Sequence, residues 1–284
     1  ALAEETIMDG TTVVADYTTL DITPYNPSIG ATVRNIDLTR PFTDAELAEL
    51  KRAFTEYQVL FFRDQQISHD DHARLAEYFG TIGQHVGKKT NSQQSDDPRV
   101  RKFYASGEVP RVSGNLWHTD QSCAPVPPMA SILYLHTIPD NGGGDTGYAS
   151  MYAAYDALSD RMKVHLEGLT AVHEGAHQFG EGTPDAVHPV IAAHPESGRK
   201  LIYVNPAFTI RINEVSPQES RALLDYLYAH CLREEWTTRF VWEPHSIAFW
   251  DNRCVWHRAI GDYLPQVRSG FRVQIEGAAP PVMA

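Results

Sequence analysis

The sequence of 284 residues is poor in cysteine, in basic residues and in long apolar runs, and each shortage excludes a class of protein. Its three cysteines, Cys123, Cys231 and Cys254, form no C-x-x-C pair, which argues against a disulfide framework or structural zinc site and favours free thiols. Lys and Arg number 24 against 36 Asp and Glu, a net charge of −12 that disfavours nucleic acid and anionic membranes as partners. Since no run of about 18 apolar residues and no signal-peptide pattern is present, we expect a cytoplasmic protein without a membrane span.

The chain also lacks internal repeats and long low-complexity linkers. Its length would suit one large domain or two of ordinary size. We expect a single domain over 1–284, with loose termini at 1–17 and 278–284. The polar stretch 88–98 has no periodicity and is predicted to be a loop.

Short strands with few helices are the dominant local pattern. Helix-capping residues predict helices over 43–58 and 68–79, and a third that begins at Ser216 with Pro217 in its first turn. Segments rich in β-branched and aromatic residues predict strands at 18–22, 58–62, 131–137, 187–193, 201–204, 240–242, 247–250 and 271–275. This pattern favours a mainly β fold, an antiparallel double-sheet roll with flanking helices packed outside it.

Two His-x-Asp triplets are candidate metal sites. His69 and Asp71 lie at the start of a predicted helix, where side chains two positions apart diverge, so they cannot chelate one ion. His118 and Asp120 lie in an extended run, where such side chains share a face. With His257 as third ligand they would form the two-histidine, one-carboxylate triad of non-haem Fe(II) oxygenases, although zinc accepts the same donors.

Two arginines near the C-terminus indicate an anion site. In a strand, Arg268 and Arg272 share one face, while Phe271, Val273 and Ile275 occupy the other. Burying a guanidinium is costly unless an anion pairs with it, and arginine can hold a carboxylate through two parallel hydrogen bonds.

These residues resemble the taurine dioxygenase / 2,4-dichlorophenoxyacetate dioxygenase family of Fe(II)/2-oxoglutarate-dependent oxygenases. The matching motifs, in family order, are Trp117-His118-Thr119-Asp120, Gly143-Gly144-Asp145-Thr146, His194-Pro195, Gly198-Arg199-Lys200, Tyr203-Val204-Asn205, Phe208-Thr209, Arg211-Ile212, Trp250-Asp251-Asn252-Arg253, His257, Arg268 and Arg272. The resemblance covers nearly the whole chain.

The resemblance implies a double-stranded β-helix, the cupin-like jelly roll. It implies Fe(II) on His118, Asp120 and His257, and 2-oxoglutarate held by Arg268 and Thr146. Arg272 would lie nearby, able to meet either 2-oxoglutarate or an anionic substrate. The implied reaction consumes O₂, hydroxylates a C–H bond of the substrate, and releases succinate and CO₂.

The resemblance also suggests a substrate pocket, with departures from taurine-using relatives. His85 matches a substrate-contacting histidine, and Phe208 matches an aromatic that lines the substrate cavity. Phe179 is a candidate for the same role, with a place in the core as the alternative. Lys88 stands where those relatives carry tyrosine, and Gly114 where they carry asparagine, so taurine itself is disfavoured. The short segment after Phe179 suggests an open pocket for a small to medium organic acid, sulfonate, aryloxyalkanoate or natural-product intermediate.

Other outcomes remain open from the sequence alone. The same cofactors support desaturation or oxidative cleavage, and a zinc hydrolase or a non-catalytic anion-binding jelly roll uses similar residues. The resemblance allows a homodimer or homotetramer, since relatives often form them, but the sequence itself indicates no interface.

Overall fold

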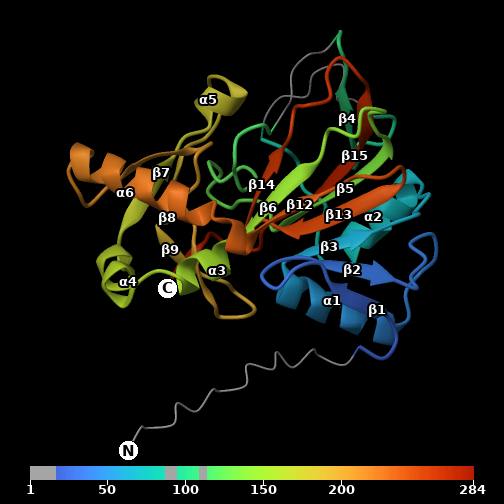
Figure 1. Cartoon of the computed structure of the whole chain (residues 1–284), viewed down its shortest axis with the longest axis horizontal. Coiled ribbons are helices and arrows are strands. Elements are labelled where there is room, and N and C mark those ends of the chain that lie inside the picture. The colour runs from blue at the N-terminus through green and yellow to red at the C-terminus, as the bar shows by residue number, and fades with distance from the viewer. Residues whose placement is uncertain (1–16, 87–94, 109–113) are drawn as a thin grey trace, which may run out of the picture.

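The computed structural model describes residues 17–86, 95–108 and 114–284, and its largest element is a seven-stranded sheet (Figure 1). The strand order is β1-β2-β3-β13-β5-β15-β4, antiparallel except for the parallel pair β2 and β3. The strands are β1 (Asp21–Pro24), β2 (Ala31–Arg34), β3 (Val59–Phe62), β4 (Arg101–Ala105), β5 (Ala130–Thr137), β13 (Ser246–Asp251) and β15 (Arg268–Ile275).

A smaller sheet, β12-β6-β14, packs against the large one. It consists of β6 (Thr146–Ser150), β12 (Thr237–Phe240) and β14 (Val255–Ala259). Phe61 of the large sheet stacks on Phe240 of the small sheet, with ring centroids 4.1 Å apart. Because side chains from both sheets share one apolar core, the two layers form the mainly β jelly roll that the sequence predicted.

Helices cover the outer face of the large sheet. Helix α1 (Asp44–Tyr57) begins with the predicted capping box of Thr43, and Ser68 caps α2 (His69–Glu77) in the same way. Phe54 of α1 stacks on Phe249 of β13 at 4.2 Å. Further elements lie on the other side of the molecule (Figure 1): α6 (Pro217–Cys231), α4 (Asp160–Leu166), β7 (Thr170–His173), β8 (Ala186–Pro189), β9 (Ile191–Ala193), β10 (Lys200–Ile202) and β11 (Thr209–Ile212).

Three predictions about the fold were wrong in detail. The strand expected over 187–193 is divided into β8 and β9, because the chain changes partners at Val190: β8 pairs with β7, whereas β9 pairs with β10. The C-terminal tail, expected to be loose, adds β16 (Val282–Met283) to the edge of β9. The strands expected at 18–22, 201–204 and 240–242 are each displaced by one to three residues.

Several elements were not predicted at all. They include β2, β4, β6, β7, β11 and β14, and the short helices α3 (Met151–Asp156), α4 and α5 (Ala176–Phe179). The expected loose segment 1–17 lies outside the described residues, except for Tyr17. Among the helices that are described, none has the length and apolar character needed to cross a membrane.

His72 provides a test of this packing. It lies on α2, fully buried, and its Nε2–H donates to the carbonyl of Ile132 at 3.2 Å. Burial lowers the pKa of His72 to about 4, whereas an unfolded histidine titrates near 6.5. The folded state therefore favours the neutral ring, and its stabilising contribution is present above pH 6.5 and lost as the pH falls toward 4.

Between pH 7 and pH 5 this histidine should cost the wild type about 2 kcal/mol of unfolding free energy. His72→Gln keeps a donor for Ile132 but cannot titrate, so its loss over the same range should be smaller by that amount. Urea unfolding at both pH values measures the difference. His165→Gln, at an exposed position of α4, should behave as the wild type does, and equal losses in His72→Gln would refute the prediction.

Candidate active site

One pair of backbone hydrogen bonds brings the predicted metal-binding residues together. His118 and Asp120 lie between β4 and β5, and His257 lies on β14. His118 N donates to His257 O at 3.1 Å, and His257 N donates to His118 O at 2.8 Å. This is an isolated bridge and not the longer extended run that the sequence suggested, but it places the two rings 4.2 Å apart.

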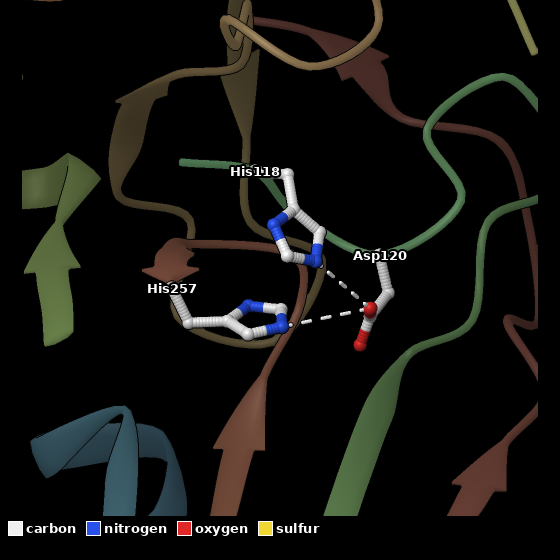
Figure 2. Close-up of side chains that lie close together, drawn as sticks. All are labelled: His118, Asp120 and His257. Carbon is white, nitrogen blue, oxygen red and sulfur yellow. Dashed lines mark ion pairs between the residues drawn. The ribbon is translucent and has the colours of Figure 1, made fainter. Parts of the chain in front are cut away.

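The three side chains point at a common position (Figure 2). Asp120 Oδ1 is 3.5 Å from Nε2 of His118 and 3.5 Å from Nε2 of His257. Adjacent ligands of an octahedral ion with bonds of ~2.1 Å lie about 3 Å apart. A small inward movement would therefore let the three atoms bind one ion. His118 Nδ1 donates to Leu116 O at 2.7 Å, which leaves the lone pair of its Nε2 for a metal.

The second oxygen of Asp120 is held by the protein. Ser131 Oγ donates to Oδ2 at 2.8 Å, and Arg272 Nη2 donates to the same atom. Ser131 in turn accepts from Asn252 Nδ2 and Gln274 Nε2, both at 3.2 Å. Because Oδ2 has these partners, Oδ1 is the oxygen that Asp120 offers to an ion. A carboxylate that binds through one oxygen would leave more coordination positions open than one that binds through both.

Sequence reasoning did not identify Ser131, Asn252 and Gln274 as part of this site. The available signal was weak: Ser131 is a small polar residue near the start of β5, before an apolar run, and it is completely buried. A buried hydroxyl requires hydrogen-bond partners, and only the tertiary contacts reveal that one of them is a candidate metal ligand.

The site holds its donors in the charge states that metal binding needs. Burial alone would raise the pKa of Asp120, but the Arg272 guanidinium and the His257 ring hold it well below its usual range. Burial, reinforced by His118, lowers the pKa of His257 to about 4. At neutral pH the carboxylate is therefore ionised and this imidazole is neutral, as ligands must be.

Arg268 forms a second part of the site. Its side chain is 1% exposed, its Nε donates to Gly144 O at 2.8 Å, and its Nη2 approaches Thr146 Oγ1 at 3.4 Å. Burial lowers the pKa of Arg268 to about 10, so it is still protonated at neutral pH. Within the described part of the chain no carboxylate pairs with it. A buried cation without a counterion is costly, so this arrangement suits a bound anion.

The surroundings of Arg268 are shaped for such a ligand. Gly144 has φ +84°, and a Cβ there would lie 2.9 Å from Arg268 Cδ, so a side chain would displace the arginine. Thr146 Oγ1 accepts from Trp242 Nε1 at 3.0 Å as well as from Arg268. With both lone pairs engaged, the hydroxyl of Thr146 is left to donate its proton to an anion.

A cavity of about 620 Å³ connects these groups. The predicted substrate residues His85, Phe179 and Phe208 all line it, with His85 and Phe179 in edge-to-face contact at 5.0 Å. Arg272 also lines it, although one of its nitrogens binds Asp120. Lys88 lies outside the described residues. Arg101, on β4, lines the cavity too and was not predicted.

A second cluster of potential metal ligands consists of His194, Asp251 and Cys254. His194 Nδ1 accepts from the backbone N–H of Glu196 and of Ser197, so its Nε2 carries the proton and donates to Asp251 at 3.0 Å. Asp251 also pairs with Arg253. These atoms already have hydrogen-bond or ion-pair partners, so we interpret the cluster as a structural contact between segments and not as a metal site. The rejected triplet at His69 is likewise engaged elsewhere, since Asp71 caps α2.

A jelly roll that joins two imidazoles, one carboxylate and a buried arginine around one cavity is typical of the class of 2-oxoglutarate-dependent dioxygenases. Comparison with known proteins specifies the family. The model of the family described as "Taurine catabolism dioxygenase TauD, TfdA family" matches residues 21–274, and the chain belongs to that family. Its members use Fe(II), 2-oxoglutarate and O₂.

Individual relatives extend over nearly the same length. A crystal structure of a taurine dioxygenase from Burkholderia xenovorans is 35% identical, with a TM-score of 0.82 over 93% of this chain and 91% of that one. The 2,4-dichlorophenoxyacetate dioxygenase of Cupriavidus pinatubonensis is 31% identical over 83% of this chain and 90% of its own. The sulfate ester dioxygenase of Pseudomonas putida is 30% identical over 92% and 91%.

Replacing Ser131 tests the support of Asp120. Ser131→Ala removes the hydroxyl that donates to Oδ2, so the carboxylate should lose its orientation and metal affinity should fall about 10-fold. Titration with Co(II), followed by its visible absorption, measures the affinity. The matched control is Ser220→Ala, a buried serine that caps a backbone N–H far from the site. Unchanged Co(II) affinity in Ser131→Ala would show that the hydrogen bond does not orient Asp120.

Proposed function

We propose that His118, Asp120 and His257 bind Fe(II), that Arg268 and Thr146 bind the distal carboxylate of 2-oxoglutarate, and that the chain hydroxylates a small or medium organic substrate. The proposal rests on one cavity that offers both ligands for a metal cation and a positively charged group for an anion. Three metal donors converge at one end, and a buried arginine without a carboxylate partner among the described residues stands nearby. Iron and 2-oxoglutarate require both.

The metal donors and Arg268 have different roles in the proposed reaction. When bound, iron and 2-oxoglutarate supply the O₂-dependent oxidation that hydroxylates the substrate and releases succinate and CO₂. The two Nε2 atoms and Oδ1 would hold the ion, and the cavity would give the cosubstrate and the substrate access to it. Arg268 fixes the orientation of the cosubstrate through its far end. The resemblance implies that Asp120 would take a ligand position that related halogenases leave to chloride, which favours hydroxylation over halogenation.

The substrate is proposed to be an organic acid. Taurine, 2,4-dichlorophenoxyacetate and sulfate esters, which appear in the names of the three relatives, all carry an acidic group. The cavity joins apolar walls at Phe179 and Phe208 to the cationic side chain of Arg272. A sulfonate, sulfate ester or aryloxyalkanoate has the matching combination of an apolar body and an anionic end.

We further propose one catalytic domain that works in the cytoplasm, binds neither nucleic acid nor membrane, and forms a dimer or tetramer. The cellular location is supported by the three cysteines, all buried and unpaired. The weak tendency to bind polyanions follows from the net charge of −12.

The proposal is tested by anaerobic titration of the protein with Fe(II) and 2-oxoglutarate, which should produce a weak visible charge-transfer band. His257→Ala should abolish the band, because two donors cannot hold the ion in the chelating geometry. Arg268→Gln should keep Fe(II) but weaken 2-oxoglutarate binding roughly 10-fold or more, since it removes a charge-assisted pair.

The control is His165→Ala, which changes an exposed histidine and should leave the band unchanged. A wild type without a band, or a band that survives His257→Ala, would contradict the assignment. A zinc hydrolase would instead turn over its substrate without 2-oxoglutarate or O₂.

A further inference from the structure

A continuous chain of hydrogen bonds leads from the wall of the cavity to the proposed metal ligand Asp120. Val86 N donates to Gln121 Oε1 at 2.6 Å, and Gln121 Nε2 donates to Gln274 Oε1 at 2.8 Å. Gln274 Nε2 donates to Ser131 Oγ at 3.2 Å, and Ser131 Oγ donates to Asp120 Oδ2 at 2.8 Å. The two glutamines and the serine are buried, so these bonds run through the interior of the protein.

The direction of this chain is fixed by its first group. A backbone N–H can only donate, so Gln121 presents its oxygen to Val86 and its NH₂ group to Gln274. That NH₂ group can also only donate, so Gln274 presents its own NH₂ group to Ser131. The Ser131 hydroxyl accepts from Gln274 and keeps its proton for Asp120. Because every bond points the same way, each one polarises the next and strengthens the bond to the carboxylate.

The hydrogen-bond chain begins in the segment 81–86, which carries a predicted substrate residue. Val86 follows His85, which lines the cavity and contacts the Phe179 ring edge to face at 5.0 Å. The same segment lies along the end of β15, where Gly83 N donates to Gln274 O at 2.9 Å. The backbone and the side chain of Gln274 therefore both connect this wall of the cavity to the interior of the site.

Gln121 has a backbone conformation that glutamine seldom adopts. Its φ is +49°, in the left-handed region that favours glycine and asparagine. The residue is 2% exposed, and its side chain joins two segments that are far apart in sequence. Strained backbone of this kind persists where the surrounding structure holds it, and it is concentrated at functional sites. Since Gln121 directly follows Asp120, the strain lies within the loop that carries the proposed metal ligands.

We propose that Gln121 is a positioning residue that links the orientation of Asp120 to the position of the segment 81–86. The inference rests on the proposed function and adds to it a connection between the metal site and the substrate pocket. Fixing Asp120 on a metal ion should order the segment that carries His85. By thermodynamic reciprocity, a molecule bound against that segment should change the affinity for the metal by the same factor.

The first test measures the Co(II) affinity of the full chain by visible absorption. Gln121→Met keeps the length of the side chain but can make neither hydrogen bond. It should weaken Co(II) binding roughly 3-fold, less than the loss of the direct partner Ser131. In the Ser131→Ala background the same change should have no further effect, because the chain of hydrogen bonds to Asp120 is already broken there.

Two further variants separate positioning from a general loss of structure. Gln121→Asn suits the left-handed backbone and should fold, but its shorter side chain cannot reach both partners. It should therefore weaken Co(II) binding as Gln121→Met does. The matched control is Gln65→Met, since Gln65 also accepts from a backbone N–H, that of Leu38, and donates to backbone carbonyls, at a position that does not line the cavity. This control should bind Co(II) as the wild type does.

The second test measures amide hydrogen exchange of residues 81–86 with and without Co(II). In the wild type and in Gln65→Met, Co(II) should slow the exchange of the Val86 N–H, because that group donates to Gln121 Oε1. In Gln121→Met, Co(II) should leave the exchange of this segment unchanged.

Three results would overturn the inference. In the first, Gln121→Met and Gln121→Asn bind Co(II) as tightly as the wild type. In the second, Gln121→Met weakens binding equally with and without Ser131→Ala. In the third, Co(II) leaves the exchange of 81–86 unchanged in the wild type. Each of these can occur while the metal and 2-oxoglutarate bind, so each leaves the proposed function intact.

Failure of the proposed function gives different results. A wild type that binds no Co(II) contradicts the proposed metal site and this inference together. A wild type that binds Co(II) but gives no charge-transfer band with Fe(II) and 2-oxoglutarate contradicts the proposed cosubstrate, and the two tests still report on Gln121.

Discussion

The reciprocal backbone hydrogen bonds between His118 and His257 are the contact on which the site depends. They join a loop residue to a strand residue far along the chain, and they set the spacing of two imidazoles before any side chain is considered. Backbone hydrogen bonds of this kind are directional, so they fix the separation of the two backbone segments from which the rings extend. Asp120 follows two residues after His118 and completes the set from the same loop.

Around that contact, hydrogen-bond partners fix the orientation of the buried charged side chains. The carboxylate of Asp120 is held by Ser131 and Arg272, and the guanidinium of Arg268 by the carbonyl of Gly144. Buried charges are costly unless they are paired. The jelly roll supports them because its two sheets provide rigid strands from which several polar side chains reach one point, while the apolar core lies behind them.

The cavity wall nearest the metal donors and the outer walls come from different elements of the fold. We propose that the donors, Arg268 and Thr146 bind the cofactors that the family shares. Phe179, Phe208 and Arg101 come from α5, from the segment before β11 and from β4, outside the strands that carry those groups. An enzyme can therefore change its substrate through these walls and keep its chemistry, which accords with the variety of acids named for its relatives.

The sequence alone determined those structural features that depend on residues only a few positions apart. The capping boxes that start α1 and α6, and the His-x-Asp spacing, are local, since each hydrogen bond or shared face involves residues within four positions. The sequence also proposed His257 as the third ligand, and the family resemblance implied the same residue. Only the tertiary structure decided that Ser131 holds Asp120, that Arg101 faces Arg272 and that the C-terminal tail joins β9. Strand register is set by contacts between distant segments, which no local pattern encodes.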